Sequence, residues 1–113
     1  MKRGFSLRKS AEIKRVRRYG TWTAHPFLAL IALPNEGQGL RVGVTAGKPI
    51  GGAVVRNRAK RVLRAAVQPL LPQIRTHHDL LLLARPGIRD ADSRELQQVI
   101  SALLKKAGLL GPN

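Results

Sequence analysis

The residues of this chain best suited to a chemical task are the arginines and lysines between positions 48 and 64, and that task is binding phosphate. The segment contains no acidic residue, and its basic side chains are Lys48, Arg56, Arg58, Lys60, Arg61 and Arg64. Guanidinium groups present parallel N–H donors that match phosphate oxygens. Asn57, which lies among them, can donate and accept hydrogen bonds toward sugars or base edges. The segment therefore predicts a surface that binds a phosphate-rich polymer.

A second basic cluster occupies residues 1–20, where eight lysines and arginines accompany a single acid, Glu12. In the whole chain 21 basic residues oppose 6 acidic ones, which gives a formal net charge of +15. Self-repulsion on this scale favours a polyanionic partner. Nucleic acid is the leading partner class, and an anionic membrane surface is the alternative. The membrane alternative is poor because the basic helix expected over 53–71 uses its apolar stripe for a core and has no apolar face left for lipid.

Nothing in the sequence indicates a catalytic or metal-binding centre built from protein side chains. The acidic residues are scattered, and Asp90 and Asp92 fit a turn and a helix cap. His77 and His78 enter an expected strand with their side chains on opposite faces, which does not suit joint coordination of a metal. The glycines of Gly43–Pro49 resemble a phosphate loop, but their spacing is too short, and proline replaces the magnesium-binding Ser or Thr. We expect no catalytic and no metal-binding residue.

Length and composition fit one small domain, residues 1–113, with 43% hydrophobic residues to form a core. The absence of cysteine excludes disulfides, a disulfide-linked partner and thiolate zinc sites. No apolar run approaches the roughly 20 residues needed to span a bilayer. The basic start leads into no apolar segment of a secretory signal. The expected location is the cytoplasm.

Periodicity and turn signals predict six elements: helices over 10–19, over 53–71 and between Asp92 and Gly108, and strands over 22–33, 40–46 and 79–84. Ser10 is the expected N-cap of the first helix, which ends at Gly20. Pro69 should kink or stop the second helix, and Asp92 with Glu95 forms a capping box on the last. The first two strands are expected to pair as a hairpin. The order α-β-β-α-β-α predicts an α+β fold, a small two-layer sandwich.

The helix over 53–71 separates into an apolar and a basic arc at about 100° per residue. Its apolar arc contains Val55, Ala59, Val62, Leu63, Ala66 and Leu70. The adjoining arc contains Arg56, Asn57, Lys60, Arg61 and Arg64, while Arg58 flanks the opposite edge of the apolar stripe. Gly51 and Gly52 at the start of this helix would let backbone amides approach an anion closely.

The stretch Lys48–Arg64, KPIGGAVVRNRAKRVLR, resembles the signature of the protein subunit of bacterial ribonuclease P. The core of the signature is Arg56-Asn57-Arg58 followed by Lys60-Arg61 and Arg64, and the strand Leu40-Arg41-Val42-Gly43 precedes it. The likeness runs from about Leu7 to Lys105. It implies a small α+β subunit with a left-handed connection between the strands on either side of this helix, whereas the usual crossover is right-handed.

The resemblance also implies the function. Such a subunit binds a large catalytic RNA that removes the 5′ leader of precursor tRNA, using Mg²⁺ bound mainly by the RNA. The protein would hold no catalytic residue, but would add affinity for the leader and reduce the magnesium requirement. The implied partners are the ribonuclease P catalytic RNA and precursor tRNA. By motif match, the residues on the RNA-subunit face would be Lys48, Arg56, Asn57, Arg58, Lys60, Arg61 and Arg64.

A second surface implied by the resemblance is a cleft between the N-terminal helix and the sheet, where the single-stranded leader lies. The residues of this chain expected there are Phe5, Arg8, Lys9, Ile13, Arg17 and Leu30. The family often has aromatic residues at the positions of Ile13, Arg17 and Leu30, and this chain has none there. Arg17 could substitute by stacking its guanidinium or by pairing with phosphate. The sequence leaves open whether Trp22 packs in the core or faces solvent.

The alternative function is that of a general RNA-binding or ribosomal-type protein with a similar arrangement of elements and no nuclease association. Competition for the catalytic RNA by arbitrary structured RNA with equal affinity would favour this alternative.

Overall fold

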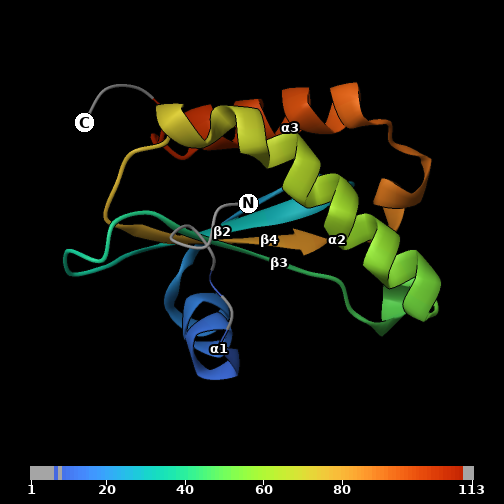
Figure 1. The fold of residues 1–113 in the computed structure, drawn as a ribbon, viewed down its shortest axis with the longest axis horizontal. Coiled ribbons are helices and arrows are strands. Elements are labelled where there is room, and N and C mark those ends of the chain that lie inside the picture. Colours follow the sequence, from blue (N-terminus) through green and yellow to red (C-terminus); the bar gives the residue numbers. More distant parts are fainter. Residues whose placement is uncertain (1–6, 8, 111–113) are drawn as a thin grey trace.

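The computed structural model describes residue 7 and residues 9–110, in which α-helices lie on both faces of a sheet (Figure 1). The elements are α1 (Ser10–Tyr19), β1 (Thr21–Ala24), β2 (Leu28–Pro34), β3 (Arg41–Thr45), α2 (Ala53–Val67), β4 (His78–Ala84) and α3 (Ser93–Lys106). Short 3-10 turns η2 (Lys48–Ile50), η3 (Gln68–Gln73) and η4 (Pro86–Asp90) connect them. The predicted α+β class is confirmed. The sheet and the α2–α3 layer form the expected sandwich, and α1 adds a partial third layer.

The strands are ordered β1-β2-β4-β3 in one sheet. β4 is antiparallel to β2 and parallel to β3. The expected hairpin between the segments 22–33 and 40–46 is therefore wrong, because β4 lies between them. Leu80, Leu81 and Leu82 of β4 are buried on both faces of the sheet, so this strand needs a neighbour on each side. The parallel strands β3 and β4 are joined through α2, and the left-handed course of this connection stays a prediction.

The first expected strand is in fact two strands, because the chain reverses at residues 25–27. The Phe27 N–H donates to Nδ1 of His25 at 3.1 Å, and the backbone groups of His25 and Leu28 hydrogen-bond to each other in both directions. Pro26 has no N–H to contribute to a strand ladder, so it occupies the turn. β1 and β2 thus form a local antiparallel hairpin that places Trp22 opposite Ile31. The observed order is α-β-β-β-α-β-α.

The two faces of the sheet belong to separate hydrophobic clusters. The larger cluster lies under α2 and α3 and includes Leu28, Leu30, Val42, Leu63, Leu80, Leu82, Ile100 and Leu104. The smaller cluster lies under α1 and consists of Leu7, Val16, Ile31 and Leu81, with Ile13, Leu33 and Leu83 packed against it. Side chains alternate between faces along a strand. Neighbours such as Leu30 and Ile31 therefore enter different clusters.

The helix ends test three sequence predictions. The capping box of α3 is confirmed, since the Asp92 side chain accepts from the Glu95 N–H at 2.8 Å. The helix expected over 53–71 is shorter, since α2 ends at Val67 and the chain continues as the 3-10 turn η3; the predicted stop near Pro69 is confirmed. The N-cap assignment of Ser10 is wrong, because Lys9 holds that position and makes no side-chain cap hydrogen bond.

None of the helices within the described residues is long and apolar enough to cross a lipid bilayer.

α1 is tied to the sheet by a buried ion-pair network. Asp79 of β4 is 1% exposed and accepts hydrogen bonds from Arg41 at 2.8 and 2.7 Å and from Asn35 at 2.9 Å. Arg41 also pairs with Glu12 of α1. Burial raises the pKa of Asp79, but the hydrogen bonds from Arg41 and Asn35, together with nearby positive charge, outweigh burial and hold that pKa below its usual value. The network therefore fixes α1 against β3 and β4.

Candidate nucleic-acid interface

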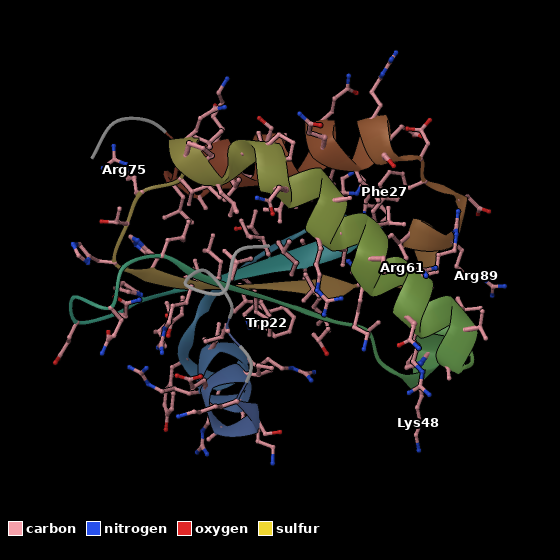
Figure 2. All side chains as sticks on the ribbon, viewed as in Figure 1. Trp22, Phe27, Lys48, Arg61, Arg75 and Arg89 are labelled. Carbon is pink, nitrogen blue, oxygen red and sulfur yellow. The ribbon has the colours of Figure 1, made fainter. Side chains whose placement is uncertain are left out.

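The polar side chains of α2 cover the part of the helix that stays outside the core. The buried stripe consists of Ala59, Leu63, Ala66 and Val67. The adjoining set, called the α2 basic face here, consists of Arg56, Asn57, Lys60, Arg61 and Arg64. Arg56 and Lys60 border the stripe and are half-buried, whereas the other three are exposed. Figure 2 shows Arg61 on the outward side of the helix. The predicted division of this helix into apolar and basic arcs is confirmed.

The donors of the α2 basic face are not consumed inside the described part of the protein. The ion pairs found there join Arg15 or Arg41 to Glu12 or Asp79, and none involves α2. Nε of Arg56 is buried without a hydrogen-bond partner among these residues. The first turn of α2 contains no acid, and its N-cap, Gly52, has no side chain that could accept a hydrogen bond from the first N–H groups of the helix. Since a helix N-terminus also carries partial positive charge, this end of α2 suits an external anion.

Arg58 and Lys48 lie apart from the α2 basic face. Arg58 lines a hollow of about 220 Å³ between α2 and η4, together with Arg89 and with Val54, which is 82% exposed. Lys48 lies in η2, and Figure 2 shows its side chain directed toward the side of the sheet where α1 lies. The structure therefore divides the seven residues of the predicted RNA-subunit face into a group of five and two outlying cations.

A groove crosses the α1 face of the sheet. Its floor is a row of cross-strand partners, one from each strand: Ala24, Ala29, Leu83 and Thr45. Two hollows of about 330 and 230 Å³ lie along this row and share Leu83 and Arg85, so we treat them as one α1-side groove. Trp22 and Arg85 border the part over β1 and β2. Arg17, Gly47 and Pro49 line the part that reaches η2.

The groove follows one row of the sheet because the next row is covered. That row consists of Trp22, Ile31, Leu81 and Gly43. Leu7 and Val16 pack on its middle members. A Cβ on Gly43 would lie 2.7 Å from the carbonyl oxygen of Leu7, so glycine is required for this close crossing. The floor row instead has short side chains at Ala24 and Ala29, which leave space above them.

The residues predicted for a leader cleft occupy different environments. Arg17 is exposed and lines the α1-side groove. Lys9 is exposed at the start of α1, and Ile13 is half-buried against the cluster under that helix. Phe5 and Arg8 lie outside the described residues.

The assignment of Leu30 to the cleft is wrong. Leu30 is 1% exposed and packs in the larger cluster, on the α2–α3 face of the sheet. A shift of one residue along a strand changes the face, and it is Ile31 that lies under α1. Ile31 is fully buried as well, so neither side chain offers a surface to a ligand.

Sequence reasoning did not assign Trp22 and Arg85, the two long side chains that border the groove over β1 and β2. Trp22 is 48% exposed, and its indole N–H donates to the Arg17 carbonyl oxygen at 3.1 Å. Arg85 donates to the His25 carbonyl oxygen at 3.2 Å. Arg85 could have been found, because residues that follow the parallel strands β3 and β4 must meet at one edge of the sheet. The face of Trp22 depends on the register of β1, which the sequence pattern did not show.

Comparison with protein families matches residues 1–108 to the family described as Ribonuclease P. The chain belongs to the ribonuclease P protein family. The ribonuclease P protein component of Chloroflexus aurantiacus is 40% identical over 111 residues, which cover 97% of this chain and 82% of that protein. The protein component of Roseiflexus castenholzii is 42% identical over 112 residues, covering 97% and 91%.

Solved structures of bacterial ribonuclease P proteins share the fold. The protein from Staphylococcus aureus matches with a TM-score of 0.80 at 24% identity, covering 95% of this chain and 98% of that one. The protein from Thermotoga maritima matches with a TM-score of 0.78 at 20% identity, covering 89% and 96%. Family membership makes this chain a protein component of ribonuclease P, a ribonucleoprotein of tRNA processing.

Proposed function

We propose that this chain binds the catalytic RNA of ribonuclease P through the α2 basic face and binds the 5′ leader of precursor tRNA in the α1-side groove. The observation that carries the proposal is the α2 basic face, where four cations flank Asn57 and none of the four forms an ion pair within the described residues. Arginine-rich helix faces of this kind suit the phosphates of a folded RNA. In this proposal the protein supplies binding only, and Mg²⁺ held mainly by the RNA supplies the hydrolytic chemistry.

The positions of the two surfaces support a protein that contacts two RNA segments at once. α2 lies on one side of the sheet and α1 on the other, so the α2 basic face and the α1-side groove are on different sides of the molecule (Figure 1). Lys48 lies near the groove end of α2, between Gly47 and Pro49. We assign it to the junction of the two surfaces.

Reconstitution tests the function as a whole. The full chain combined with a bacterial ribonuclease P RNA should restore cleavage of precursor tRNA at a magnesium concentration where the RNA alone is inactive. An absence of any effect on cleavage would contradict the proposal. Equal competition by arbitrary structured RNA would instead favour the general RNA-binding alternative.

The α2 basic face is tested by Arg61→Ala against the matched control Arg75→Ala. Both arginines are exposed, and Figure 2 places them in different parts of the molecule, Arg61 on α2 and Arg75 beyond its far end. Removing one phosphate contact should lower the log–log dependence of RNA affinity on salt by about 0.9 on a duplex scale. Arg61→Ala should show this change and Arg75→Ala should not. An equal slope for the two variants would refute a specific role of the α2 basic face.

The groove is tested by Arg17→Glu against the neighbouring Arg18→Glu. Arg17 lines the α1-side groove, whereas Arg18 lies over the ring of Tyr19 with its guanidinium carbon 5.4 Å from the ring centroid. Arg17→Glu should weaken binding of leader-bearing precursor tRNA while leaving assembly with the catalytic RNA largely intact. Similar losses for leader-bearing and leaderless RNA, or for the two variants, would contradict the groove assignment.

A further inference from the structure

The part of the α1-side groove next to β1 has the features of a site for one unpaired nucleobase. Its lining consists of Trp22, Ala24, Ala29, Leu83 and Arg85, around a volume of about 330 Å³. This volume lies at the lower end of the range for small-ligand pockets. The floor is apolar, and the border has one aromatic ring and one guanidinium. Such a combination suits a flat aromatic group that is attached to a phosphate.

Trp22 is held in place on the border of this site. Its indole N–H donates to the carbonyl oxygen of Arg17 at the end of α1, at 3.1 Å, which restricts rotation of the ring. The side chain is nevertheless 48% exposed, so much of its surface is available to a ligand. Fixing an aromatic ring before binding lowers the entropy lost when a base stacks on it.

Arg85 and Arg17 supply the charge beside the ring. Arg85 uses one N–H in its bond to the His25 carbonyl oxygen at 3.2 Å. A guanidinium has five N–H donors, so this contact leaves others for a phosphate. Arg17 lines the adjoining part of the groove, and both arginines are exposed. No ion pair within the described residues involves either of them.

We infer that one base of the single-stranded 5′ leader stacks on Trp22 in this site, with the flanking phosphates on Arg85 and Arg17. Basic grooves with aromatic platforms are the general means of binding single-stranded nucleic acid. The aromatic residue comes from β1, so it lies across the groove from the α1 positions Ile13 and Arg17, which carry no aromatic ring in this chain. The inference rests on the proposed function and adds to it the residue that contacts a base.

Fluorescence provides a direct test, because Trp22 is the only tryptophan in the chain. The full chain is assembled with the catalytic RNA and then titrated with three RNAs: precursor tRNA with a natural leader, precursor tRNA with an abasic leader of equal length, and tRNA without a leader. We expect the natural leader to quench Trp22 emission. The other two RNAs should leave the emission at the value of the assembled complex before titration. Equal changes with the abasic leader, or no change at saturation with the natural leader, would overturn the stacking site.

Substitution provides the second test. Stacking of one base on an aromatic side chain corresponds to roughly a 5- to 150-fold change in affinity. Trp22→Ala should weaken binding of leader-bearing precursor by a factor in this range and leave leaderless tRNA unaffected. Trp22→Phe, which keeps a ring, should recover most of the loss. Tyr19→Ala is the matched control, since Tyr19 is 65% exposed but does not line this site.

The outcomes separate the subsite from the proposed function. If the wild-type chain does not stimulate cleavage by the catalytic RNA, both proposals fail. If it does, and Trp22→Ala binds leader-bearing precursor as well as the wild type, only the stacking site fails. A loss that Trp22→Phe does not recover, or a loss shared by leaderless tRNA, indicates a structural role for Trp22 and also overturns the inference.

Discussion

The α2 basic face and the α1-side groove are built in opposite ways. Every member of the α2 basic face comes from one helix, within residues 56–64, and their spacing alone puts them on one side. The floor of the α1-side groove takes one residue from each of four strands, between positions 24 and 83. A face made by one helix depends on local periodicity, whereas a groove across a sheet depends on strand order and register.

This difference has a consequence for stability. The α2 basic face lies over the larger hydrophobic cluster, which continues into α3. The α1 side has the smaller cluster and relies in addition on the network of Arg41, Asp79 and Glu12. Substitutions in that network should therefore disturb the groove more than the α2 basic face.

The largest expected effect is that of Arg41→Met. This change leaves Asp79 charged and buried with Asn35 as its remaining close partner, and breaking a buried ion pair in this way costs about 3–5 kcal/mol. Urea denaturation should show the loss. Arg15→Ala is the control, because its half-exposed guanidinium is 4.0 Å from Asp79 and such pairs contribute about 0–1 kcal/mol. A similar small loss for both variants would remove the argument that this network holds α1.

The same ion pair predicts a loss of stability in acid. The pKa of Asp79 is lowered in the folded protein, so the stabilisation is fully present above the ordinary aspartate pKa of about 3.9 and is lost as the pH falls through the lower folded value. The contribution of Asp79 to stability should stay constant from pH 7 to about pH 5 and decline below about pH 4. Comparison with Asp79→Asn in acid denaturation isolates it. An equal acid dependence in the variant would contradict this origin.

Leu30→Ala should separate stability from leader binding. Truncating a fully buried leucine costs about 2–5 kcal/mol. Because Leu30 faces α2 and α3, the ratio of affinities for leader-bearing and leaderless precursor should stay at the wild-type value under conditions where the variant is folded. Thermal unfolding and binding assays measure the two quantities. A selective loss of leader binding would contradict this prediction and indicate that Leu30 contributes to the groove.

The smallest expected effect belongs to Asp92→Ala, because Asp92 lies in the capping box of α3 and belongs to neither surface. Loss of this cap should lower stability by about 1 kcal/mol. Neither assembly with the catalytic RNA nor leader binding should change under conditions where the variant is folded. Calorimetry and the two binding assays provide the check, and a selective change in either binding step would show that α3 takes part in a surface.

The elements that the sequence predicted correctly are those with strong local signals. The arcs of α2, its end before Pro69 and the capping box at Asp92 all depend on residues within a few positions of each other. The strand pairing was mispredicted because pairing depends on partners far apart in the chain. Leu30 was misplaced for the same reason, since its face is decided by alternation relative to β1 and β4.

The sequence by itself determined the charge of +15, its concentration on residues 1–20 and 48–64, the family, and the helix that displays the arginines. Only the tertiary structure decided that Trp22 borders a groove and that Arg17 and Arg85 line it together. The physical reason is the separation along the chain between the residues that must come together. Helical spacing acts over 3.6 residues per turn, whereas the position of Trp22 required a turn at residues 25–27 and the insertion of β4 beside β2.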